Sequence, residues 1–173
     1  MEVVVNNNMQ HGYTYLRIRP AGDIGDLERM YGFRPELTPK EMLALGVFGG
    51  KYFNDVANTD EYPRDWWPEA KLSGLGNPAD PSLNFFGVLA SSSLAQWRKK
   101  GWIADQDPRG WFEWYARTYM GRRSEDDERQ VMRQIRFRRH LSQLTRNCFP
   151  GDFECRPKQR QALLQWAYDS RRY

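Results

Sequence analysis

The sequence predicts a mainly α-helical fold, a single-domain bundle of about six or seven helices with a long irregular loop region. Three observations lead to this prediction. Helix-start signals, in which Ser, Thr or Asp precedes Pro or a Glu or Gln three residues on, recur along the chain. Strand-like patterns occur only near the N-terminus. No repeat or linker divides residues 1–173, a length that suits one hydrophobic core.

The first elements are the weakest. We expect residues 1–12 to be loosely ordered, and the only strand candidates are residues 3–5 and 13–18, so at most a minor N-terminal strand pair forms. Asp23 is placed to cap a short helix that Gly32 ends.

A glycine-rich turn follows the next helix. Thr38 to Glu41 is a capping box with Pro at the first helical position, and the helix it opens ends at Gly46. The turn continues to residue 53 and resembles part of a helix-hairpin-helix unit, in which glycine amides approach a DNA phosphate. Lys51 would then be a phosphate ligand. The alternative is a helix–helix turn whose glycines permit close packing.

Residues 54–91 are expected to form the irregular region, since prolines and acids interrupt every periodic pattern there. Asp55 and Asp65 are our catalytic candidates in this region, because burial beside Trp66 and Trp67 can raise the pKa of a carboxyl group. The alternative for each acid is a helix cap or an ion-pair partner.

Helix signals are strong in the last part of the chain. Capping residues, closing glycines and Pro at first helical positions delimit four helices, which we expect within residues 93–101, 107–121, 124–147 and 156–169.

Arginine dominates the charge of this last part. The protein has 26 Lys and Arg against 22 Asp and Glu, a net charge of +4. Residues 101–173 hold 15 of these cations, all but one of them Arg, and 10 of the acids. Such a surface favours a polyanion as partner, although an ordinary solvated basic face has the same composition.

On a helical wheel, one polar ridge runs along residues 124–147. At about 100° per residue, Arg129, Arg133, Arg136 and His140 share one direction, with apolar residues on both sides. We interpret the ridge as the wall of a groove that binds an anion, with His140 as a further donor or an acid/base group. The alternative is a buried ion-pair network with acids such as Asp55.

Neighbouring residues extend this hypothesis. Arg122 and Arg123 would add phosphate contacts, and Trp111, with Trp66 and Trp67, would stack on bases. The rings of residues 111–119 share one helix face, which is equally typical of a core.

The expected state of the two cysteines depends on the cellular location of the protein. No apolar run reaches the length of a membrane span and the N-terminus lacks a signal-peptide pattern, so we expect a cytoplasmic or nuclear location. Reduced thiols are then expected at Cys148 and Cys155. A disulfide between them, or a zinc site with His140, is the alternative. No other cofactor is expected.

The chain also resembles a family of small proteins from bacteria, fungi and viruses to which no activity is attached. The resemblance rests on the segments GVFGGKYFND, DPRGWFEWY, GRR and CRPKQRQALLQWAYD and spans about residues 37–170. It implies no function.

The leading hypothesis is a nucleic-acid-associated protein, with a small enzyme acting on a base or nucleotide as one form of it. An enzyme with a pocket for an anionic metabolite and a protein–protein adaptor are the alternatives.

Overall fold

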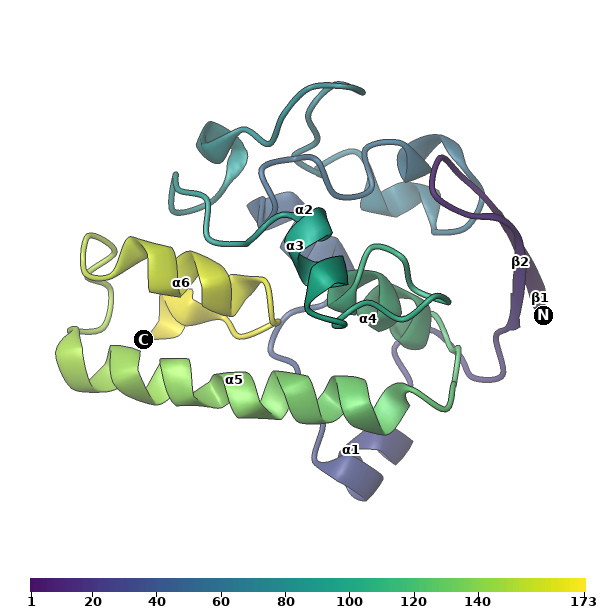
Figure 1. Ribbon diagram of the computed structural model, residues 1–173. Helices are drawn as coiled ribbons and strands as arrows, with labels where there is room; N and C mark the ends of the chain where they lie inside the picture. The colour runs from purple at the N-terminus through teal and green to yellow at the C-terminus, as the bar shows by residue number, and fades with distance from the viewer. The chain divides into compact units, whose positions relative to one another are not determined.

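The computed structural model describes residues 1–173 and confirms the mainly helical fold with one antiparallel N-terminal hairpin (Figure 1). The strands are β1 (Glu2–Asn6) and β2 (His11–Leu16). The helices are α1 (Gly25–Tyr31), α2 (Pro39–Leu45), α3 (Leu94–Lys99), α4 (Trp111–Tyr119), α5 (Asp127–Asn147) and α6 (Pro157–Leu164). None of the helices is both long and apolar enough to cross a membrane.

The chain forms two compact units. Unit 1 comprises residues 1–34, 55–64 and 92–132, and unit 2 comprises residues 35–54, 65–91 and 133–173. Helix α5 therefore begins in unit 1 and continues in unit 2. The single-domain organisation expected for the chain stays a prediction.

The N-terminal hairpin belongs to unit 1. Val3 and Val5 alternate with exposed residues, and both pack with Tyr15 of β2. This alternation suits a half-buried strand, and β1 forms at the strand candidate of residues 3–5, within a start that was expected to be loosely ordered. Beyond β2, the Ile18 amide donates to the Gly121 carbonyl, at 2.9 Å. Only glycine fits at that point, since a Cβ on residue 121 would lie 2.0 Å from the Arg19 carbonyl oxygen.

Helix α4 is the centre of unit 1. Every residue from 111 to 118 is buried, and Phe33 packs edge-on against Trp114 and Tyr115. The Trp114 indole donates to Asp127 at the start of α5, at 2.9 Å. Because all sides of α4 are covered, its two charged residues, Glu113 and Arg117, lie in the interior and need buried partners.

Unit 2 contains the glycine-rich turn. The expected capping box of α2 forms, but no second α-helix follows the turn. Cβ atoms on Gly46, Gly49 or Gly50 would lie under 3 Å from the backbone or side chains of residues 72–83. The Gly49 amide donates to Asn84, at 2.6 Å. The glycines thus permit close packing within unit 2, which is the alternative to the phosphate-binding hairpin.

The rest of unit 2 packs around α6. Residues 65–91 contain turns and two short 3-10 helices, which agrees with the expected irregular region. Side-chain amides of Gln161 and Gln165 donate to the Val47 carbonyl. Helix α6 lies beside the C-terminal part of α5 (Figure 1), where Leu144, Leu163 and Tyr168 form a small core.

Candidate functional site

Seven charged side chains form a closed group inside unit 1, which we call the buried charge cluster. Its members are Arg109, Arg117, Arg122, Asp55, Glu61, Asp107 and Glu113. Each side chain is at most 8% exposed. Glu113 has a spacing of four residues to both Arg109 and Arg117, a spacing that favours ion pairs on a helix.

Arg117 is at the middle of the cluster. Its guanidinium lies 2.7 Å from Glu61, 3.1 Å from Asp107 and 3.3 Å from Glu113, and the side chain has no exposed surface. It also donates to the Gln10 side chain. Removal of this one side chain would leave three carboxylates without their shared cation.

The other two arginines each bind an acid. Arg109 holds Asp55 through two hydrogen bonds of 2.8 and 2.7 Å. Arg122 donates to Asp107, at 2.6 Å. The two-point contact of Arg109 with Asp55 fixes both partners in orientation. Asp55, which we expected in catalysis, is therefore an ion-pair partner of Arg109. Arg122, which we expected to bind phosphate, is an ion-pair partner of Asp107.

The cluster contains four acids but only three arginines. Burial raises the pKa of Glu113 to about 7, against the lowering effect of Arg117. Burial also acts to raise the pKa of Asp55, but its hydrogen bond and charge pairing with Arg109 outweigh burial and the pKa is lowered. A proton on Glu113, which its raised pKa favours, would balance the charges. The cluster is thus a sealed, nearly neutral group with no surface for a substrate.

The predicted ridge on α5 does not act as one row. Arg129 pairs with Asp126 one turn earlier. Arg133 lies over the Trp166 ring, 5.4 Å from its centroid, and the Nδ1 atom of His140 is 3.1 Å from the Gln159 amide nitrogen. Burial and then Arg139 lower the pKa of His140. Of the four ridge residues, Arg136 is exposed and has no ion pair.

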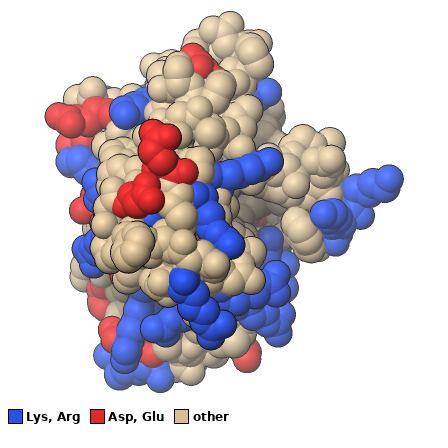
Figure 2. All heavy atoms as spheres, turned by 90° about the vertical axis from the view of Figure 1, so that its left-hand side faces the viewer, with Lys and Arg blue, Asp and Glu red and all other residues tan.

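Three exposed arginines instead form a row on the unit 2 part of α5, which we call the basic row: Arg136, Arg139 and Arg146. They fall within about 80° of one another on the wheel and have no acidic partner. Figure 2 shows Lys and Arg side chains gathered in the lower part of the face where the end of α5 lies, with fewer acids among them. The helical wheel already places these three arginines on one side of the helix. Only the structure shows that all three are exposed.

The remaining predicted site residues are scattered. Lys51 is exposed, and Asp65 is an exposed partner of Lys40, at 2.7 Å. Arg123 binds Asp26, whose pKa falls to about 2 through that hydrogen bond.

Of the three tryptophans proposed for stacking, two are buried and one is half-buried. Trp66 and Trp111 are 4% and 5% exposed, and Trp67 is half-buried. Trp111 donates its indole hydrogen to the Gln130 carbonyl. Trp66 and Trp111 are therefore core residues that offer no face to a base.

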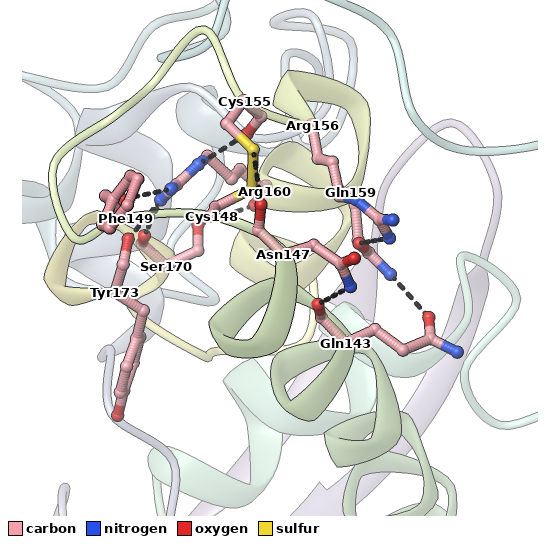
Figure 3. Close-up of a disulfide and its surroundings, with 10 residues drawn as sticks. All are labelled: Gln143, Asn147, Cys148, Phe149, Cys155, Arg156, Gln159, Arg160, Ser170 and Tyr173. Carbon is pink, nitrogen blue, oxygen red and sulfur yellow. Dashed lines mark hydrogen bonds between the residues drawn. A yellow bond between two sulfur atoms is a disulfide. The ribbon is translucent and has the colours of Figure 1, made fainter.

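A disulfide joins Cys148 and Cys155, whose Cα atoms are 5.8 Å apart (Figure 3). The expectation of reduced thiols is wrong in this structure, and with both sulfurs bonded the two cysteines and His140 form no zinc site. No group of three or more His, Cys, Asp or Glu residues has the arrangement of a metal site. Disulfides are rare in reducing compartments, and the expected cytoplasmic or nuclear location stays a prediction.

Comparisons of the chain with protein-family models, with curated proteins and with solved structures found no match. The family resemblance of the sequence therefore stays an expectation, and any function has to be argued from the residues themselves.

Proposed function

We propose that the protein binds nucleic acid through its phosphate backbone, at the basic row of unit 2. The observation that carries this proposal is the exposure of Arg136, Arg139 and Arg146 on one helix face with no acid to neutralise them. An exposed guanidinium fork suits phosphate oxygens, which it contacts through paired hydrogen bonds.

The surroundings of the row support the same partner. Unit 2 holds 13 Lys and Arg against 8 Asp and Glu, whereas unit 1 holds 13 against 14. The row extends roughly 15 Å along α5 at 1.5 Å per residue. Arg156 and Lys158, at the start of α6, are also exposed. A net positive unit with an unpaired row attracts a polyanion.

The proposal is for binding and includes no reaction. The predicted catalytic acid Asp55 is sealed in the buried charge cluster, and the predicted stacking residues Trp66 and Trp111 are core residues. Phosphate contacts alone give binding with little sequence preference.

The test is a titration of a fluorescent oligonucleotide, followed by anisotropy at several salt concentrations. We expect tight binding at low salt that weakens steeply as salt rises. The variant Arg136→Glu/Arg139→Glu/Arg146→Glu should lose binding. If each arginine contacts one phosphate of a single strand, replacing all three reduces the slope of log affinity against log salt by about 2.

A matched control separates the row from overall charge. Arg64, Arg98 and Lys99 are exposed cations of unit 1, and their reversal to Glu changes the net charge by the same amount. This control should weaken binding much less than reversal of the basic row. Equal losses in both variants, or no binding by the unmodified protein even at low salt, would contradict the proposal.

A further inference from the structure

We infer that Phe149, at the end of the basic row, stacks on a nucleobase, so that the site selects single-stranded over double-stranded nucleic acid. This inference rests on the proposed phosphate binding and adds the class of nucleic acid. Phe149 follows the last residue of α5 by two positions, and Arg146 precedes it by three.

The Phe149 side chain is 82% exposed, more than any other large hydrophobic side chain of the protein. A single exposed ring is common on protein surfaces and carries no argument by itself. The argument comes from how firmly its backbone is held and from the charges beside it.

The backbone of Phe149 is fixed on both sides. The Cys148 amide continues the α5 hydrogen-bond pattern to Leu144, at 2.9 Å, and the disulfide closes the loop at Cys155. The Phe149 carbonyl accepts from the Asp152 amide, at 3.2 Å. Gly151, with φ of 82°, provides the left-handed position of the turn. A ring on such a loop loses little conformational entropy when a base covers it.

Arg160 adds a second support from beneath the loop (Figure 3). Its side chain is buried and donates to the Cys155 carbonyl, at 2.9 Å, and to Phe149, at 3.5 Å. It also donates to the carbonyls of Ser170 and Tyr173. No carboxylate pairs with it. The guanidinium thus ties both ends of the loop to residues 170–173 and is itself unavailable to a ligand.

The charges divide the site into a phosphate side and a base side. The loop itself carries two exposed acids, Asp152 and Glu154, which repel phosphate. The cations lie on α5, from Arg136 to Arg146. A strand whose phosphates follow the arginines therefore places an uncharged base, and not its backbone, against Phe149.

Only an unpaired strand can use the ring in this way. In a duplex the bases are stacked on one another and are not free to cover an external ring, whereas single strands offer their base faces to aromatic side chains. Phosphate contacts by the arginines are possible with both forms. Stacking by Phe149 thus gives single strands a higher affinity than duplexes.

The test compares one labelled oligonucleotide as a single strand and as a duplex, with the full-length protein and its Phe149→Ala and Phe149→Trp variants. We expect Phe149→Ala to weaken single-strand binding about tenfold and to leave duplex binding unchanged. Phe149→Trp, which keeps a stacking ring, should restore single-strand binding.

The outcomes separate this inference from the proposed function. If reversal of the basic row abolishes binding while Phe149→Ala has no effect on single strands, the inference is wrong and the proposed function holds. If the unmodified protein binds neither form, the proposed function is wrong. Equal losses by Phe149→Ala on both forms would also overturn the inference.

Two further measurements address the loop and the partner. The double variant Cys148→Ser/Cys155→Ser should weaken single-strand binding about threefold, because a loosened loop must be ordered on binding. An unchanged affinity would show that the disulfide does not help to hold Phe149 for stacking. Binding to vesicles of phosphatidylcholine and phosphatidylserine tests whether the partner of Phe149 is a lipid surface. If Phe149→Ala lowers vesicle binding and leaves oligonucleotide binding intact, the ring serves a lipid surface and the inference fails.

Discussion

Units 1 and 2 contain equal numbers of Lys and Arg, 13 in each, but use them differently. Unit 1 places three arginines in its interior and surrounds them with four acids. Unit 2 leaves Arg136, Arg139 and Arg146 on the surface without acids. The number of arginines therefore does not distinguish the two units, whereas the number of acids beside each arginine does.

Arg160 shows that burial and acid pairing are separate matters. It lies in unit 2, is buried, and uses backbone carbonyls where Arg117 uses carboxylates. Burial lowers the pKa of Arg160. Burial also acts to lower the pKa of Arg117, but Tyr62 and the surrounding carboxylates outweigh it and the pKa is raised. Carbonyl groups offer partial charge only, so this site keeps a net positive charge and the cluster in unit 1 does not.

The largest effect should come from Arg117→Met. The change leaves Glu61, Asp107 and Glu113 buried without their shared cation, and loss of one partner from a buried charge pair costs about 3–5 kcal/mol of the free energy of unfolding. Urea denaturation measures this loss. The same change at Arg139 should cost less than about 0.5 kcal/mol. Similar losses at the two positions would break the contrast between the units.

Glu113→Gln should remove the pH dependence of stability that Glu113 creates in unit 1. The pKa of Glu113 rises from 4.5 to about 7 on folding, so its contribution to stability is complete below pH 4.5 and is lost as pH rises through 7. Between about pH 5 and 8, the unmodified protein should lose about 2–3 kcal/mol relative to the variant. Parallel stability curves over that range would show that Glu113 is already ionised in the folded protein.

Unit 2 should depend on its disulfide. The bond closes a loop of eight residues, and removing it through Cys148→Ser/Cys155→Ser should cost about 2.5 kcal/mol in the chain-entropy model. Hydrogen exchange should locate the loosened amides in residues 148–173. The unmodified protein with its disulfide reduced serves as the control and should behave in the same way. Loosening confined to unit 1 would contradict this assignment.

The smallest effect is expected from Arg136→Ala/Arg139→Ala/Arg146→Ala. These side chains have no ion pairs to lose, so each change should alter the free energy of unfolding by less than about 0.5 kcal/mol. Thermal and urea denaturation measure this directly. A large loss of stability would mean that the row supports the fold, and the two units would then differ less than the contacts indicate.

Much of the fold followed from local signals in the sequence. The capping boxes at Thr38 and Ser93 formed as expected, and the helix expected to end at Asn147 ends there. These features depend on residues three or four apart, so a sequence contains all the information they need. The strand candidate at residues 3–5 became β1, although only two buried alternating valines, Val3 and Val5, mark it.

The site was harder to predict because its contacts join distant residues. A wheel gives the direction of a side chain but not which neighbour covers that direction. Arg133 and His140 point toward Trp166 and Gln159, partners that no periodicity reveals, and Arg122 is covered by Asp107. Arg139 and Arg146 could have been found on the same wheel. The apolar residues on both sides of the predicted ridge indicate that the ridge is partly covered, and this would have directed attention to the arginines outside it.

The buried charge cluster also has a consequence for the order of folding. Asp55 and Glu61 lie 54 and 56 positions from the arginines they bind, and Asn7 lies 102 positions from Arg109. Such distant contacts form only after large loops close, whereas helices such as α5 form within about a microsecond. Until then, the arginines and acids of unit 1 remain hydrated. We expect water to leave this group late, so that its assembly, and not helix formation, sets the folding rate of unit 1.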